Sequence, residues 1–179
     1  FAGDSTWERL WAVGINDTQG IFSEPRQIIA HRSHVIVLDA ATREVRVLDL
    51  QSGRVELTMV AHGVGPGEFK RPAKLTKTPE GFAILDHESG RLSNFSVGGA
   101  LQWDFTVPDV FEVSSFCIPD GQTVVAYYSR ARDNVVHFDT AGRRLSQQSV
   151  PWAHQRTELE ASGNPSFAAN ATPGLGCAL

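Results

Sequence analysis

Six histidines are the side chains of this sequence best suited to binding a metal ion, because imidazole is the commonest metal ligand in proteins. They are His31, His34, His62, His87, His137 and His154. A zinc site would need several of them within about 2.1 Å of one point. Their places in the expected strands and loops are unrelated: His87 follows a strand, whereas His137 lies inside one. The pattern predicts surface or hydrogen-bonded histidines, no metal site and no cofactor.

Catalytic arrangements are poorly represented as well. The sequence contains no Gly-x-Ser-x-Gly motif, no cysteine–histidine pairing and no paired-carboxylate motif, which are the patterns that activate a nucleophile or a proton donor. Cys117 lies in an apolar run, so a buried core thiol is its expected role. The alternative is a bridge between Cys117 and Cys177, which would require an oxidising compartment. No catalytic residue is predicted.

Four residues are candidates for contacting a ligand: Tyr128, Arg130, Arg132 and His87. Tyr127 and Tyr128 are adjacent in an expected strand, so they point to opposite faces and only one of them can belong to the core. The two arginines follow in a polar turn, for which a solvated loop is the alternative interpretation. A binding surface would gather these side chains with the loop after Asp86 on one face.

A glycine-rich segment, Gly63, Gly65 and Gly67 around Pro66, predicts a tight structural turn. Glycine adopts positive φ without the cost that other residues carry. A phosphate-binding loop is the alternative, but no Lys-Ser/Thr pair follows and the next element is expected to be a strand rather than a helix.

Two aspartates, Asp39 and Asp86, each end an expected strand just before a turn. A short carboxylate in that place accepts hydrogen bonds from nearby backbone N–H groups. The position predicts that both residues fix turns rather than act in catalysis.

All these residues belong to a repeated pattern. The segment Phe22-Ser-Glu-Pro25-Arg-Gln-Ile28 recurs 47 positions later as Phe69-Lys-Arg-Pro72-Ala-Lys-Leu75, and a third copy follows after another 43. Each copy holds four short runs of β-branched and aromatic residues, separated by Gly, Pro, Asp or Ser, which are strand and turn signals. Four antiparallel strands repeated at this spacing are typical of a β-propeller blade.

The expected strands are 26–30, 35–38, 44–48 and 54–60 in the first copy, 73–76, 81–85, 91–95 and 101–107 in the second, and 113–118, 123–128, 134–138 and 143–150 in the third. The predicted organisation is an N-terminal strand segment at 1–21 that would close a full ring, blade 1 at 22–68, blade 2 at 69–108, blade 3 at 109–152, and a partial fourth blade or ragged C-terminus at 153–179.

The stretch Gly63-Val-Gly65-Pro66-Gly67-Glu68-Phe69, followed by Pro72 and Ile84-Leu85-Asp86, resembles the segment that joins successive blades of NHL-type six-bladed β-propellers. The resemblance covers roughly residues 22–152 and is strongest to the exported and lipid-anchored bacterial members. It implies an all-β fold of four-stranded antiparallel blades and a periplasmic or cell-surface location. The third copy departs from the pattern, because its proline is lost and Ser129 takes the place of the aspartate.

Six blades of about 45 residues would need roughly 270, so a chain of 179 residues is expected to form an incomplete six-bladed propeller. Because it begins with Phe1, we expect a processed chain or a part of a longer one. Uncovered blade faces and strand edges favour self-association.

Composition narrows the function classes. The chain is 41% hydrophobic with a formal net charge of −4 and no cluster of Lys and Arg, and no apolar run is long enough to cross a membrane. Nucleic acid is therefore not an expected partner. The fold predicts a non-enzymatic binding or scaffold module that presents its loops to a protein, a peptide or a glycan.

The resemblance also implies an alternative, because NHL-like propellers include a zinc-dependent amidating lyase. This chain would then be a metal-dependent lyase or lactone-hydrolase-like enzyme acting at the propeller channel. The expected innermost strands offer few ligands for such a site, since Gln27 and Lys74 are the only strongly polar side chains well inside the first two.

Overall fold

A computed structural model describes residues 9–12, 21–129 and 134–149. Within these ranges the chain forms twelve strands in three four-stranded sheets. Blade 1 contains β1 (Pro25–His31), β2 (His34–Asp39), β3 (Glu44–Asp49) and β4 (Val55–Val60). Blade 2 contains β5 (Pro72–Lys77), β6 (Gly81–Asp86), β7 (Arg91–Ser96) and β8 (Leu101–Thr106). Blade 3 follows a 3-10 turn, η1 (Val110–Glu112), and contains β9 (Val113–Cys117), β10 (Thr123–Tyr128), β11 (Asn134–Asp139) and β12 (Arg144–Ser149).

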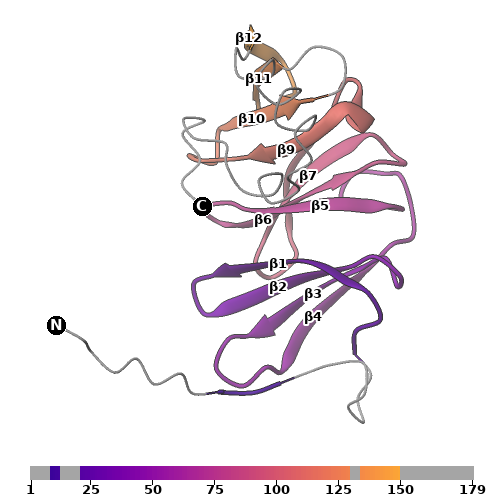
Figure 1. The fold of residues 1–179 in the computed structure, drawn as a ribbon, viewed down its shortest axis with the longest axis vertical. Helices are drawn as coiled ribbons and strands as arrows, with labels where there is room; N and C mark the ends of the chain where they lie inside the picture. The colour runs from indigo at the N-terminus through magenta and orange to yellow at the C-terminus, as the bar shows by residue number, and fades with distance from the viewer. Residues whose placement is uncertain (1–8, 13–20, 130–133, 150–179) are drawn as a thin grey trace, which may run out of the picture.

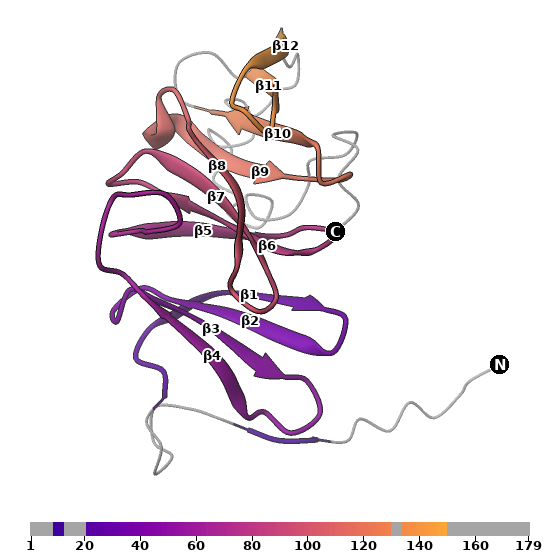
Figure 2. The same cartoon turned by 180° about the vertical axis from the view of Figure 1, so that it is seen from behind.

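Each blade is a simple antiparallel meander in which consecutive strands are neighbours. The three blades follow one another along the long axis of the molecule (Figure 1). Their first strands lie together, since β5 contacts both β1 and β9, and β8 lies on the opposite side, which Figure 2 shows from behind. This arrangement of sheets around a shared inner edge is that of propeller blades, so the predicted all-β fold is confirmed.

The start of each blade has the same register. Pro25 lies opposite Asp39 and Pro72 lies opposite Asp86, at the first position of an edge strand, where a missing N–H costs no ladder hydrogen bond. In blade 3 the corresponding pair is Val113 and Tyr128.

The aspartate position of blade 3 is therefore filled by Tyr128, and its assignment to Ser129 was wrong. The Ser129 N–H donates to the carbonyl of Glu112. The first residue after the aspartate forms the same bond in the other blades, since Ala40 donates to Glu24 and His87 to Arg71. An extra residue between the second and third strands of blade 3 hid this correspondence in the sequence.

The core lies between the blades. The interface of blades 1 and 2 is filled by buried side chains that include Ile36, Val45 and the stacked rings of Phe82 and Phe95, whose centroids are 5.7 Å apart. The interface of blades 2 and 3 contains Phe105 and Phe138, 5.8 Å apart. Aromatic rings of this size fill the wedge between neighbouring sheets.

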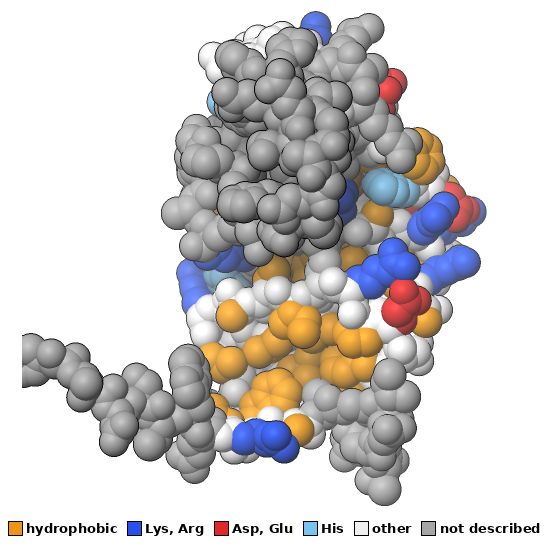
Figure 3. All heavy atoms as spheres, viewed as in Figure 1, with side chains coloured by type: hydrophobic (Ala, Val, Ile, Leu, Met, Phe, Trp, Pro, Cys, Tyr) orange, Lys and Arg blue, Asp and Glu red, His pale blue; other side chains and the backbone are white. Residues whose placement is uncertain are grey.

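The face of blade 1 that points away from blade 2 is also apolar, and we call it the distal face. It carries Phe22, Val37 and Leu48, with the partly buried Trp11, Ile21, Val35 and Val55. Ile28, which lies opposite Val37 in the sheet, is 65% exposed. In the view of Figure 3, hydrophobic side chains (orange) gather over blade 1.

Part of the predicted N-terminal strand can be compared with the structure. Residues 9–12 lie outside any strand, and the Trp11 indole packs against Gly53 of blade 1 and donates to the Leu50 carbonyl at 2.8 Å. Residues 1–8 and 13–20 of the predicted N-terminal segment fall outside the described residues, as do the predicted segment 153–179 and Cys177.

Two further findings concern expectations from the sequence. Cys117 is disulfide-bonded, so the expectation of a buried free thiol was wrong. In the part of the chain that the structure describes, no helix is long and apolar enough to span a membrane.

Candidate functional site

Both crossovers between blades and the turns after the second strands lie at one end of the molecule, which we call the crossover end. Antiparallel pairing places the start of each first strand beside the end of the second. The crossover from β4 to β5 and the crossover from β8 to β9 therefore meet the turns that follow β2, β6 and β10. Two of the predicted ligand-contacting residues, His87 and Tyr128, belong to this end.

Asp39 ties the chain that enters blade 1 to the turn after β2. Its buried carboxylate accepts backbone N–H bonds from Ser23 at 2.6 Å, Glu24 at 3.0 Å, Ala41 at 3.1 Å and Thr42 at 3.1 Å. Burial raises the pKa of this carboxyl, but the four N–H donors outweigh burial and hold the pKa below its usual value.

Asp86 makes the same kind of connection in blade 2. Its carboxylate accepts N–H bonds from Lys70 at 2.8 Å, Arg71 at 2.5 Å and Ser89 at 2.6 Å. The crossover and the turn are thereby held as one unit, which fixes the side chains that they carry.

The glycines of the first crossover have two different roles. Gly67 has a φ of +73°, the left-handed conformation that glycine adopts without steric cost. Gly63 and Gly65 instead leave room for the Glu68 carboxylate, because a Cβ on Gly63 would overlap it. That carboxylate accepts the Gly65 N–H at 3.0 Å. The expectation of positive φ applies to Gly67 and not to Gly63 or Gly65.

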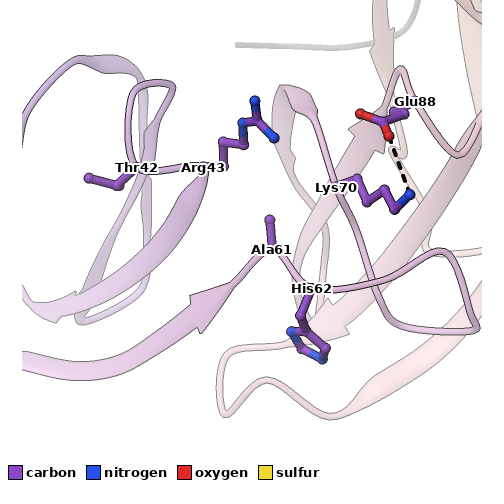
Figure 4. A pocket seen from close by; sticks show the side chains of 6 residues that line it. All are labelled: Thr42, Arg43, Ala61, His62, Lys70 and Glu88. Atoms are coloured by element: carbon purple, nitrogen blue, oxygen red, sulfur yellow. Dashed lines mark ion pairs between the residues drawn. The ribbon is translucent and has the colours of Figure 1, made fainter.

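A hollow of about 350 Å³, which we call the blade 1–2 pocket, opens between the first crossover and the turns of blades 1 and 2. Six residues line it: Thr42, Arg43, Ala61, His62, Lys70 and Glu88 (Figure 4). Lys70 Nζ lies 3.4 Å from Glu88 Oε1, and His62 Nε2 lies 3.7 Å from Glu68 Oε1. Except for His62, the pocket's charged residues were not among the sequence-based candidates.

A larger hollow of about 630 Å³, which we call the blade 2–3 pocket, lies between the second crossover and blade 3. Its lining combines aromatic and other apolar side chains with polar and charged ones. The lining residues are Pro108, Asp109, Glu112, Tyr128, Asn134, Val136, Phe138, Gly142, Arg144 and Gln147. The Tyr128 hydroxyl donates to the Pro108 carbonyl at 3.0 Å. Burial, together with the charges of Asp109 and Glu112, raises the pKa of Tyr128 to about 12, so the phenol stays protonated and remains a hydrogen-bond donor.

His87 lies at the same end but outside both pockets. Its ring contacts the Phe111 ring of the second crossover, with centroids 5.2 Å apart. The Nε2 atom is buried without a hydrogen-bond partner among the described residues. Burial and the charges of Lys74 and Arg71 lower the pKa of His87.

The second crossover therefore links two of the four predicted ligand-contacting residues. Phe111 contacts His87, and Pro108 accepts the Tyr128 hydroxyl. The other two candidates, Arg130 and Arg132, lie outside the described residues.

The two polar residues of the inner strands behave differently from each other. Gln27 Oε1 accepts the Leu75 N–H at 2.6 Å and thus joins blade 1 to blade 2. Lys74 is half-buried, has no ion pair within the described residues, and has its pKa lowered by burial. Among the residues that the structure describes, no three His, Cys, Asp or Glu side chains are grouped closely enough to hold a metal ion.

Sequence comparison found no matching protein-family profile and no related curated protein. Solved structures do resemble the chain in fold. A protein of Bacteroides fragilis, provisionally named an exported protein, gives a TM-score of 0.59 at 14% identity, over 75% of this chain and 40% of its own. Hydrazine synthase of Kuenenia stuttgartiensis gives 0.51 at 17% identity, over 66% of this chain and 33% of its own. U3-55K gives a TM-score of 0.50 at 14% identity, over 69% of this chain and 42% of its own.

At this low identity the likeness establishes the fold alone. The likeness agrees with the four-stranded blades described above. The chain spans between 33% and 42% of the length of these three structures.

Proposed function

We propose that this chain is part of a non-enzymatic binding module, built as a six-bladed propeller of the NHL type, that presents its crossover end to a protein, a peptide or a glycan. The observation that carries the proposal is the blade 2–3 pocket, which begins at the second crossover and extends along β11 and β12 as far as Gly142. Fold alone does not define a function, so the proposal rests on this site.

The chemistry of the pocket suits recognition. Tyr128 supplies a ring and Phe138 an apolar floor, while Asp109, Arg144 and Gln147 supply charged and polar groups at the rim. Pockets that combine an apolar surface with a few fixed polar groups bind side chains and sugar rings, since the apolar part gives affinity and the polar part gives orientation. The Arg144 guanidinium donates to Gln147 Oε1 at 2.9 Å, which orders this part of the rim.

The predicted exported location is part of the same proposal. Disulfides persist in oxidising compartments such as the periplasm and the cell surface, and Cys117 is disulfide-bonded. A ligand from those compartments is therefore the natural class to screen.

The test is a screen of the purified protein against a glycan array and a displayed peptide library, followed by titration of each ligand found. Arg144 and Gln147 are exposed, so Arg144→Ala with Gln147→Ala should leave folding intact and weaken a ligand of this pocket at least tenfold. Arg54→Ala is the matched control, because Arg54 is an exposed arginine at the other end of blade 1. A screen that yields no ligand sensitive to the double variant would contradict the proposal.

One observation favours the alternative, a metal-dependent lyase or lactone-hydrolase-like enzyme at the channel. Lys74 is a half-buried amine on an inner strand, with a lowered pKa and with His87 as an electrostatic neighbour. A lysine whose pKa is lowered by burial is a better base than one in water.

This alternative is tested by measuring the metal content and lactone hydrolysis of the purified protein. Lys74→Met should abolish the activity, while Lys77→Met, at an exposed position of the same strand, should not. Equal activity in the two variants would rule out a role for Lys74.

A further inference from the structure

We infer that the blade 1–2 pocket binds a carboxylate group of a ligand through the guanidinium of Arg43. The inference rests on the proposed function in so far as the crossover end is the binding surface, but it concerns a different pocket and names the chemistry of the ligand. It follows from three observations: the charge balance of the pocket, the conformation of Arg43 and the contrast with a second arginine.

The charge balance leaves one cation available. Lys70 is paired with Glu88 at 3.4 Å. His62 faces Glu68, and its Nδ1 lies 2.6 Å from the Val60 carbonyl oxygen. The Arg43 guanidinium has no hydrogen bond or ion pair with any described residue, although it lies beside these groups.

The direction of the Arg43 side chain agrees with a role in binding a carboxylate. Figure 4 shows Arg43 extending toward the space that Lys70 and Glu88 border, whereas the Thr42 side chain points away from it. Guanidinium presents a planar fork of N–H donors that matches the two oxygens of a carboxylate. A singly charged anion of this kind would balance the pocket.

The backbone of Arg43 is the second observation. Its φ is +57°, in the left-handed region where residues other than glycine are uncommon. The equivalent position of blade 2, also just before the third strand, is Gly90, with a φ of +69°. Strained positions of this kind cluster at binding sites, where a side chain is needed in a place that favours glycine.

The third observation is that a second arginine with positive φ lacks the pocket. Arg32 has a φ of +52° in the hairpin between β1 and β2, at the opposite end of the blade. Its guanidinium donates to the Pro79 carbonyl at 3.2 Å. Arg32 therefore has a structural partner, whereas Arg43 has none among the described residues, and Arg32 provides a matched control.

The experiment is calorimetric titration with two carboxylate probes, acetylated hexaglutamate and trigalacturonate, with hexaglutamine as the uncharged control. The wild type should bind at least one carboxylate probe and not hexaglutamine. Arg43→Gly should bind at least tenfold more weakly without a fall in Tm, because glycine adopts a positive φ without steric strain. Arg43→Gln should also lose binding, while Arg32→Gly should bind like the wild type.

Each outcome decides the inference. Dependence on Arg43 with hexaglutamate identifies a peptide carboxylate, and the same dependence with trigalacturonate identifies a sugar acid. Binding that is equal in the wild type and both Arg43 variants, or no binding of either probe, would overturn the inference. The proposed function would survive that result, since its test uses Arg144 and Gln147 in the other pocket.

Discussion

At the scale of single residues, the buried turn aspartates organise the crossover end. Asp39 accepts four backbone N–H groups from two segments of the chain. Ser23 and Glu24 lie 16 and 15 positions before Asp39, whereas Ala41 and Thr42 follow it in the turn. Each of these donors would be left without a partner if the carboxylate were removed. The charge of Asp39 therefore holds the two loop segments together.

Replacing Asp39 by asparagine is expected to destabilise the protein by about 3 kcal/mol, because a buried charged acceptor is exchanged for a weaker neutral one and N–H groups lose their partner. Urea unfolding measures the free energy of unfolding. Asp120→Asn is the control, since Asp120 also accepts turn N–H groups but is exposed. Asp120→Asn should lower the free energy of unfolding by less than about 1 kcal/mol. An equal decrease in both variants would contradict the role of burial.

The same carboxyl gives a pH prediction. The pKa of Asp39 is lower in the folded protein than its ordinary value. The stability it contributes is therefore present above the unfolded-state pKa and is lost as the pH falls through the folded-state pKa. The difference in unfolding free energy between the wild type and Asp39→Asn should shrink as the pH is lowered from neutral toward the acid range, and a difference that does not change with pH would disprove the linkage.

Residue roles were only partly predictable from the sequence. The turn bonds of the two aspartates could be predicted because a carboxylate at a strand end acts on near neighbours in the chain. Their bonds to the segment that enters each blade could not, because those donors lie 15 or 16 positions away. Tyr128 was recognised as a candidate, but its equivalence to Asp39 was not, because the extra residue in blade 3 shifts the alignment by one. Arg43 was overlooked, although its alignment with Gly90 in the repeat was a usable signal.

At the scale of elements, the inner edges of the blades are joined by side chains. The first strand of each blade is an edge strand, so some of its backbone N–H groups have no strand partner. Gln27 of β1 reaches across and accepts the Leu75 N–H of β5. The link supports the buried apolar contacts between the two blades.

Gln27→Leu is expected to cost about 2 kcal/mol, because it leaves the Leu75 N–H without an acceptor in a partly buried place. Hydrogen exchange resolved by residue should show faster exchange at the Leu75 amide than in the wild type. Gln102→Leu, at an exposed position on β8, should leave that amide unchanged. Unchanged protection of Leu75 in Gln27→Leu would show that the link is dispensable.

The strands themselves were predicted well. The sequence interpretation put the second strand of blade 1 at 35–38, and β2 spans His34–Asp39, because β-branched runs between turn residues define strands locally. The pockets could not be predicted, since each is made of segments that only the packing of neighbouring blades brings together. The Lys70–Glu88 pair, for instance, joins a crossover to the turn of the following hairpin.

At the scale of the whole molecule, the distal face of blade 1 has no blade against it among the described residues. Its interior positions are apolar, and Ile28 is 65% exposed beside Val37. Propeller blades bury such faces against a neighbouring blade. The face is therefore suited to contact with further protein, from the same chain or from another copy.

The purified 179-residue chain is expected to self-associate through this face. Ile28→Asp should lower the association measured by sedimentation velocity over a range of concentrations, because a charge would be buried at the contact. Leu145→Asp is the control, as Leu145 is similarly exposed at 56% on β12 of blade 3. Equal weakening by both variants, or a wild type that remains monomeric throughout, would exclude the distal face as the contact.

The division of the molecule into two ends has a practical consequence for engineering. The end opposite the crossovers consists of tight hairpin turns, and in the one between β7 and β8 an added Cβ on Gly98 would meet only the Ser96 hydroxyl, at 3.9 Å. A fluorescent reporter inserted there would stand a full strand length from the blade 1–2 pocket, which lies at the crossover end. The blades could thus carry an optical readout at one end while the other is left open to a ligand.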